Sequence, residues 1–313
     1  MNQDKKKYFK ILDSIDFNKI KEHPNILIAA HFWEEERYCA AKICYRFLRV
    51  IDDMIDDFKA KNQNIPPECR QEFKTSVDDW LKMIVTSVSC NPQQKELIDT
   101  IEKYRIPLWP MEAFARSMIY DINHDGFRTM EDFLDYSTGA TVAPAAIFVH
   151  LNGLKKNHTE YIEPVFDVKE AATPCAVFSY IVHIIRDFQK DQLNNLNYFA
   201  DDVIHKNGLS RAELRRIALG APVSDGFRNL ITEYYQLADR YRLETSAMIS
   251  RLKPVLEPRH QLSLEIIFSL YLLVYEKIDP VNGNFTAGAL NPTPDETKAR
   301  VSETIRKFQP AFI

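Results

Sequence analysis

The sequence predicts an all-α protein, a single helical bundle around a central cavity. Glycine is rare, with only 8 among 313 residues. Apolar residues recur at helical spacing along nearly the whole chain. There is no run of alternating polar and apolar residues, and no Asn-Gly turn between such runs, as hairpins require. No linker rich in proline, glycine or serine divides the chain, so we expect residues 1–313 to form one domain.

The elements follow from this spacing and from the residues that begin helices. The pattern predicts helices over 35–59, 68–90, 93–105, 110–122, 130–151, 168–191, 210–219, 225–252, 258–278 and 294–308. Thr129 is expected to cap one helix. Ser210 with Glu213 and Thr293 with Glu296 fit capping boxes that begin two others. Residues 192–209 are expected to form a loop.

Composition limits the function classes. The formal net charge of -4, from 44 acidic and 40 basic residues, indicates no nucleic-acid partner. The most apolar later stretch, residues 262–275, is too short to span a bilayer and contains Glu265. The N-terminal residues contain no apolar run of signal-peptide length. We therefore expect a cytoplasmic protein with no transmembrane helix, for which peripheral membrane contact stays open. The five scattered cysteines are expected to be free thiols.

The stretch RFLRVIDDMIDDF, residues 46–58, places like charges one helical turn apart. Asp52 and Asp56 form one such pair, and Asp53 and Asp57 form another. Carboxylates at this spacing repel each other, so the arrangement costs stability unless a cation is bound. Magnesium is typically held by one or two carboxylates together with substrate phosphates. An ordinary amphipathic surface helix would explain the pattern equally well.

A second acidic cluster favours the metal interpretation. In residues 179–192, His183, Asp187 and Asp191 lie at successive helical turns, with Arg186 and Lys190 beside them. If the two helices face each other across a bundle, four carboxylates converge on one pocket, and bundle cores commonly hold such sites.

This arrangement suits the ionisation of a diphosphate. Carboxylate-bound magnesium can neutralise a departing diphosphate, and arginines such as Arg49 and Arg186 add bidentate phosphate contacts. The allylic cation left behind needs a dry cavity with aromatic walls. The predicted helices contain aromatic residues that could line such a cavity. These are Phe32, Phe47, Phe178, Tyr180, Phe268 and Tyr271. Packing in the protein core explains each of them at least as well.

Both motifs resemble those of squalene and phytoene synthases. YRFLRVIDDMIDD resembles the family's first aspartate-rich motif, and HIIRDFQKDQLNNLNYF resembles its second, within a similarity over about residues 25–285. The resemblance implies an isoprenoid-synthase-type helical bundle. It also implies magnesium-dependent head-to-head joining of two prenyl diphosphates, farnesyl or geranylgeranyl, through a cyclopropyl intermediate. Squalene synthases then reduce this intermediate with NADPH whereas phytoene synthases do not, so NADPH use is undecided here.

Site residues carry over by position in the two motifs. The resemblance makes Asp52, Asp56, Asp187 and Asp191 the expected metal ligands and catalytic aspartates. Tyr45 matches the tyrosine before the first motif and is a further expected catalytic residue. Arg49 and Arg186 match the arginines of the two motifs and are expected to bind diphosphate. Lys190 is a further expected diphosphate ligand. Other residues that could belong to the site are Asp53, Asp57, His183, Tyr180 and Tyr136.

This sequence also departs from the family pattern. HPNIL, residues 23–27, replaces a Ser-x-Ser-Phe element, and only Tyr136 could stand for the tyrosines of another family motif. His183 replaces an asparagine, Tyr180 a glutamine and Lys190 an acidic residue. The metal motifs are intact, whereas the second diphosphate site is altered.

Three functions therefore remain. Head-to-head coupling is favoured. The alternatives are a terpene synthase that ionises one allylic diphosphate and cyclises or hydrates it, and a non-catalytic relative. The oligomeric state is not indicated.

Overall fold

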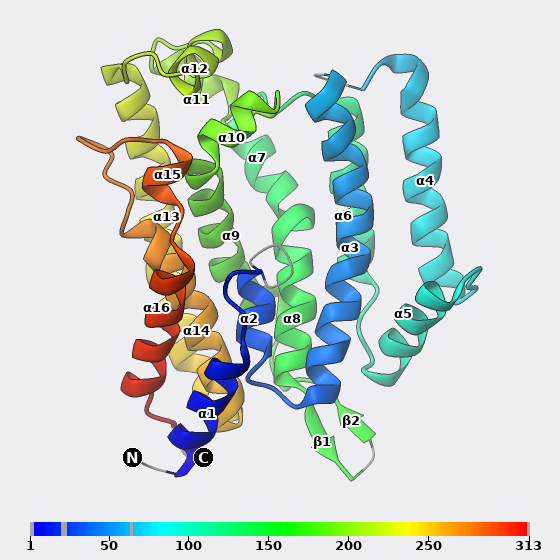
Figure 1. Cartoon of the computed structure of the whole chain (residues 1–313). Coiled ribbons are helices and arrows are strands. Elements are labelled where there is room, and N and C mark those ends of the chain that lie inside the picture. The colour runs from blue at the N-terminus through cyan, green and yellow to red at the C-terminus, as the bar shows by residue number, and fades with distance from the viewer. Residues whose placement is uncertain (1–2, 20–23, 63–64, 159, 312–313) are drawn as a thin grey trace.

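The computed structural model describes residues 3–19, 24–62, 65–158 and 160–311 (Figure 1). The regular secondary structure of the described residues is almost entirely helical, which confirms the predicted all-α class. The helices are α1 (Gln3–Ser14), α2 (Asn25–Ala30), α3 (Glu35–Asn62), α4 (Pro67–Thr86), α5 (Pro92–Lys103), α6 (Trp109–Asn123), α7 (Met130–Ser137), α8 (Ala143–Gly153), α9 (Val168–Arg186), α10 (Phe188–Leu193), α11 (Asp201–Lys206), α12 (Arg211–Ala218), α13 (Asp225–Leu252), α14 (Pro258–Tyr275), α15 (Ala287–Leu290) and α16 (Pro294–Lys307).

Three shorter features complete the chain's secondary structure. The π-helix η1 (Thr138–Val142) joins α7 to α8, and the 3-10 turn η2 (Lys253–Val255) follows α13. Strands β1 (Lys155–Asn157) and β2 (Glu160–Ile162) form a small antiparallel hairpin. This hairpin, α1 and α2 were not predicted, and α11 forms within the segment expected to be loop.

The predicted helix starts are confirmed. Thr129, Ser210 and Thr293 each accept a hydrogen bond from the third residue of their helix, and each closes a capping box. These signals depend only on neighbouring residues, so they could be identified without knowledge of the tertiary structure.

Two predicted helices are interrupted. The helix expected over 130–151 contains η1, where α6 comes so close that a Cβ on Gly139 would lie 2.1 Å from the Ala113 carbonyl oxygen. The helix expected over 168–191 ends at Arg186, because Asp187 has φ -91° and ψ 1° and the chain restarts as α10. Both breaks lie beside the site described below, where π-helices and irregular turns are common.

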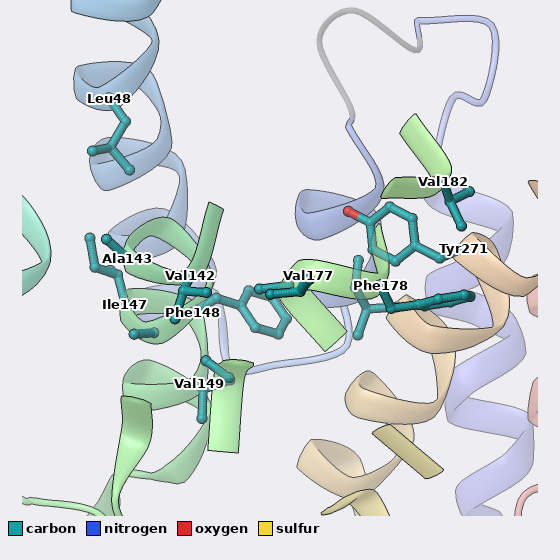
Figure 2. Packing of buried hydrophobic residues seen from close by; sticks show 14 of the residues in the cluster. Leu48, Val142, Ala143, Ile147, Phe148, Val149, Val177, Phe178, Val182 and Tyr271 are labelled. Atoms are coloured by element: carbon teal, nitrogen blue, oxygen red, sulfur yellow. The ribbon is translucent and has the colours of Figure 1, made fainter. Parts of the chain in front are cut away.

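The arrangement of the long helices positions the two motifs. In Figure 1, α3 and α9 both run upward, with α7 and α8 between and behind them. The motif of residues 46–58 therefore lies towards the upper end of α3, near the junction of α9 and α10. Helix α9 packs closely against α8 and α13. Figure 2 shows this packing, in which Phe148 of α8 points towards Val177 of α9.

Among the described helices, one is long and apolar enough to cross a membrane by length and composition alone. It is Val168–Arg186, and 61% of it is buried inside the molecule. Since it is the central helix of the bundle, its apolar character is accounted for by the core.

Candidate active site

The first motif divides between two faces of α3. Asp52 and Asp56 are half-buried, whereas Asp53 and Asp57 are exposed. Residues one position apart differ by about 100° around a helix, so the two pairs must face different directions. Arg49 forms ion pairs with both Asp52 and Asp53. The inward-facing pair is therefore Asp52 and Asp56, and Asp53 and Asp57 face solvent.

The second motif spans the break between α9 and α10. Arg186 donates two hydrogen bonds to the Asp187 carboxylate, from Nε to Oδ1 at 2.8 Å and from Nη2 to Oδ2 at 2.6 Å. Asp191 is half-buried one turn later, while Lys190 is exposed. The charge of Lys190 favours the ionised form of both aspartates, although burial and the charge of Asp187 raise the pKa of Asp191 overall.

Carboxylates of both motifs act through their charge on Tyr180 of α9. Burial raises the pKa of this phenol well above its ordinary value, and the nearby carboxylates of Asp52, Asp56 and Asp191 raise it further. Acidic groups of α3 and α10, which are distant in the sequence, therefore influence the same side chain. Asp187 adjoins the same group, since its charge raises the pKa of Asp191.

Asp121 of α6 is a third acidic group at the first motif, and sequence reasoning missed it. Its carboxylate accepts a hydrogen bond from the hydroxyl of Tyr136 and lies 3.4 Å from Nζ of Lys59. Its charge raises the pKa of both Asp52 and Asp56. Its position near the end of the predicted helix 110–122 gave no sign that it would join the first motif.

The carboxyls differ in how readily they ionise. Burial, then the charges of Asp52 and Asp121, raise the pKa of Asp56 to about 8. Burial and the charge of Asp187 raise the pKa of Asp191 to about 7. Burial also raises the pKa of Asp52. Asp187 is the exception: burial alone would raise its pKa, but the hydrogen bonds and charge of Arg186 outweigh burial and lower it.

This donor set fits magnesium. Among the described residues, none donates a hydrogen bond to the carboxylate of Asp56 or Asp191, so their oxygens are free to bind a cation. All four predicted ligands are hard oxygen donors, as magnesium prefers. A bound cation would also relieve the repulsion that raises their pKa values.

A cavity of about 450 Å³ lies beside the second motif and extends along α9. Its polar end carries Arg49, His183, Arg186 and Asp187, and Tyr45 lines the same region. Its remaining wall is mostly apolar and comes from α8, α9, α13 and α14. Members of that wall are Ala145, Phe148, Val149, Ala171, Ala172, Ala176, Met248, Ile249, Leu252, Leu264 and Ile267.

The other predicted residues lie in different places. Of the aromatic residues suggested for the cavity wall, Tyr271 lines it, whereas Phe32 and Phe178 are fully buried in the core. Tyr136 is buried against Asp121 instead. Asp56 and Asp121 line a separate small hollow of about 10 Å³.

The altered segment HPNIL, residues 23–27, borders the main cavity. His23 lies outside the described residues, while Pro24, Asn25 and Ile26 line the main cavity.

His183, which lines the cavity, has a ring nitrogen without a hydrogen-bond partner among the described residues. Its Nε2 is buried, and no residue in the described ranges bonds to it. Burial, together with the charge of Arg186, lowers the pKa of His183 to about 3. Its ring meets the ring of Tyr271 edge to face, with centroids 5.1 Å apart. The imidazole is therefore neutral at physiological pH.

A second group of metal-ligating residues lies elsewhere. One ligand atom each from Glu34, Glu257 and His260 falls within 4.8 Å of the others. However, Arg259 binds the Glu34 carboxylate at 2.8 Å, and Arg37 bonds to Nε2 of His260 at 3.1 Å. Two guanidinium groups already supply positive charge there, so these residues form a structural network that ties α3 to α14.

Solved structures resemble this fold over most of the chain. A dehydrosqualene synthase in complex with ligand aligns with a TM-score of 0.65 and 13% identity, covering 97% of this chain and 99% of its own. YisP from Bacillus subtilis aligns with 0.61 and 15%, covering 96% and 99%. The squalene synthase HpnC from Alicyclobacillus acidocaldarius aligns with 0.53 and 15%, covering 77% and 93%. At these identities the likeness concerns the fold alone.

Sequence comparison identifies the family. No curated protein matches the sequence at a significant level. A family model described as squalene/phytoene synthase, however, matches residues 21–301. Since this match covers most of the chain and includes both aspartate-rich motifs, the protein belongs to the squalene/phytoene synthase family, as those motifs indicated.

Proposed function

We propose that this protein joins two prenyl diphosphates head to head in a magnesium-dependent reaction, giving a squalene- or phytoene-type product. The observation that carries this proposal is the shape and chemistry of the 450 Å³ cavity. Its arginines and carboxylates suit a diphosphate, and its long apolar wall suits a prenyl chain. Ligand cavities of a few hundred Å³ commonly combine an apolar lining with a few convergent polar groups.

The four aspartates would hold the metal. Asp52, Asp56, Asp187 and Asp191 would bind magnesium ions, which supply charge neutralisation for the diphosphate as it leaves. Asp121, which adjoins the first pair, would tune the affinity through its own charge. Tyr136 and Lys59 hold Asp121 in place from two sides.

The arginines would bind and orient the diphosphate. In this structure Arg49 and Arg186 are paired with aspartates of the two motifs. Both also line the cavity, so their guanidinium groups can contact phosphate oxygens in bidentate fashion. The exposed Lys190 would add charge at the rim.

The rest of the cavity would protect a cation from water. Thr141 and Ser179 both donate their hydroxyl hydrogens to the carbonyl oxygen of Ala176, and Thr245 donates to that of Tyr241. Because these hydroxyl hydrogens are engaged within the protein, each hydroxyl would offer a carbocation in the cavity only its oxygen lone pairs. The neutral imidazole of His183 and the ring of Tyr271 add no positive charge that would oppose a carbocation.

A second candidate is a terpene synthase that ionises one substrate. It is favoured by the residues that replace the Ser-x-Ser-Phe element, since Pro24, Asn25 and Ile26 line the cavity without any charge. A second diphosphate would then have fewer partners. The non-catalytic alternative has less support, because a chain freed from catalysis would have no reason to keep carboxyls whose pKa values are raised by mutual repulsion.

Binding stoichiometry separates the two enzymatic functions. A prenyl thiodiphosphate, in which sulfur replaces the bridging oxygen, cannot ionise, and calorimetric titration with magnesium counts the sites. Coupling predicts two equivalents per chain. One equivalent, with a product no longer than the substrate, would contradict coupling and favour the single-substrate enzyme.

Lys190 provides a sharper form of this titration. If its charge helps to hold one diphosphate, Lys190→Glu should weaken one of the two binding events about tenfold and leave the other unchanged, because charged hydrogen bonds contribute more than about 1 kcal/mol. Lys82→Glu, at an exposed position of α4, is the matched charge reversal. An equal effect of both variants would mean that general electrostatics, and not a contact of Lys190, is responsible.

A further inference from the structure

The wall that α9 contributes to the cavity is made of small side chains. Ala171, Ala172, Cys175, Ala176 and Ser179 all line it, at steps of one turn below His183. Because such side chains project little, they leave a continuous channel along the helix. The polar end of the cavity is at His183, Arg186 and Asp187, so the channel leads away from the diphosphate-binding groups.

Along α9 the lining of the cavity ends at Ala171, and along α13 it ends at Leu252. Ala171 and Leu252 are buried, with exposures of 6% and 3%. Just outside them, Arg251 of α13 forms an ion pair at 2.7 Å with Glu170, the residue before Ala171. We therefore take Ala171 and Leu252 as the floor of the cavity, because no residue further towards this end of α9 or α13 lines it.

The length of the channel can be compared with prenyl chains. If a diphosphate lies beside Arg186 and Asp187, the first carbon of its chain lies about one turn lower, near His183. From His183 to Ala171 the helix descends about 18 Å at about 1.5 Å per residue. An isoprene unit adds four chain bonds, or about 5 Å at about 1.2 Å per bond of an extended chain. Counted from the first carbon, three units therefore reach about 13 Å and four units about 18 Å.

From this match we infer that the cavity is built for a chain of four isoprene units, so that the substrate is geranylgeranyl diphosphate and not farnesyl diphosphate. The inference deepens the proposed function and rests on it. The fourth unit lies between Cys175 and Ala171, in the part of the channel that a farnesyl chain leaves empty. Ala172 is the residue that keeps this part open.

Phenylalanine substitutions at different distances from His183 along α9 test the four-unit assignment. The wild-type protein with magnesium should bind geranylgeranyl thiodiphosphate at least about tenfold more tightly than farnesyl thiodiphosphate, because one more isoprene unit is removed from water. Ala172→Phe should weaken the geranylgeranyl analogue at least about tenfold and change the farnesyl analogue less than about threefold. Ala176→Phe, one turn nearer to His183, should weaken both.

Two further variants guard against trivial explanations. Thr173→Phe adds the same ring to the same helix at a position that does not line the cavity, and it should leave both affinities unchanged. Leu252→Ala removes part of the floor and should admit an analogue with five isoprene units, which the wild type excludes. Leu252→Ala and the comparison of the two analogues on the wild type test the four-unit assignment even if a phenylalanine variant does not fold.

The outcomes distinguish this inference from the proposed function. If the wild type binds neither analogue in the presence of magnesium, the proposed function itself is wrong. If it binds both and prefers farnesyl, or does not discriminate, the proposed function stands and the four-unit assignment is overturned. An equal loss of both analogues in Ala172→Phe, with Thr173→Phe unaffected, would also overturn the assignment.

Discussion

Asp56→Asn is expected to reduce turnover of a prenyl diphosphate at least about a hundredfold and, at the same time, to stabilise the metal-free protein. The loss of turnover follows from removal of one charged group that would hold the magnesium ions and, through them, the departing diphosphate. The gain in stability follows from the pKa of Asp56, which burial and its acidic neighbours raise to about 8. A carboxyl with a raised pKa contributes its full stability below its unfolded pKa of about 4, and this contribution is lost as the pH rises through about 8.

The expected gain in the free energy of unfolding follows from the raised pKa of Asp56. Near pH 8 the ionised Asp56 destabilises the fold, and one pKa unit corresponds to about 1.4 kcal/mol. Since Asp56 is half-buried and its neighbours share the repulsion, we expect Asn to raise the free energy of unfolding by about 1–2 kcal/mol. Thermal melting in the presence of a chelator, at pH 8, measures it.

Asp187→Asn is the matched control, because its stability effect should have the opposite sign. Arg186 lowers the pKa of Asp187, so the ionised pair stabilises the fold above the unfolded pKa of about 4. Its loss should lower the free energy of unfolding by about 1 kcal/mol, while turnover falls as much as in Asp56→Asn. Retained activity in both variants, or equal destabilisation by both, would mean that the aspartates serve only the fold.

Magnesium affinity is expected to rise at least about a hundredfold between pH 6 and pH 8, because metal ligands must lose their protons before they bind. The pKa of Asp191 is about 7 and that of Asp56 about 8, so both carboxyls are largely protonated at pH 6. The stabilisation that magnesium confers should therefore grow with pH. Melting temperatures with and without magnesium at pH 6, 7 and 8 measure this trend.

The source of the released protons can be tested separately. Calorimetric titrations in two buffers of different ionisation enthalpy count the protons that magnesium displaces. At pH 7 the wild type should release more protons than Asp56→Asn, which lacks one of the titrating ligands. An affinity for magnesium that does not vary with pH would contradict the assignment of Asp56 and Asp191 as ligands.

The sequence was informative where a structural feature depends on neighbouring residues. Thr129, Ser210 and Thr293 cap their helices because the capping partner lies three residues away in each case. The separation of Asp52 and Asp56 from Asp53 and Asp57 on two faces of α3 follows from helical geometry alone. The family and its all-α fold could be identified because both motifs are contiguous in sequence.

Features that depend on packing could not be predicted. Asp121 joins the first motif only because α6 packs against α3, and no local pattern reports that contact. The π-helix at Thr138–Val142 accompanies the close approach of Gly139 to α6. The interruption at Asp187 was missed because apolar spacing continues across it into α10. Each of these features borders the site, where local preference and tertiary structure disagree most.

Analysis of the reaction product tests the central claim most directly. The protein is incubated with farnesyl or geranylgeranyl diphosphate and magnesium, with and without NADPH, and the extract is analysed by mass spectrometry. Head-to-head coupling predicts a hydrocarbon with twice the carbon number of the substrate, absent when magnesium is chelated. A change in the product's hydrogen content on adding NADPH would mean that a reduction step follows. A product that retains the carbon number of one substrate, cyclised or hydrated, would contradict the account.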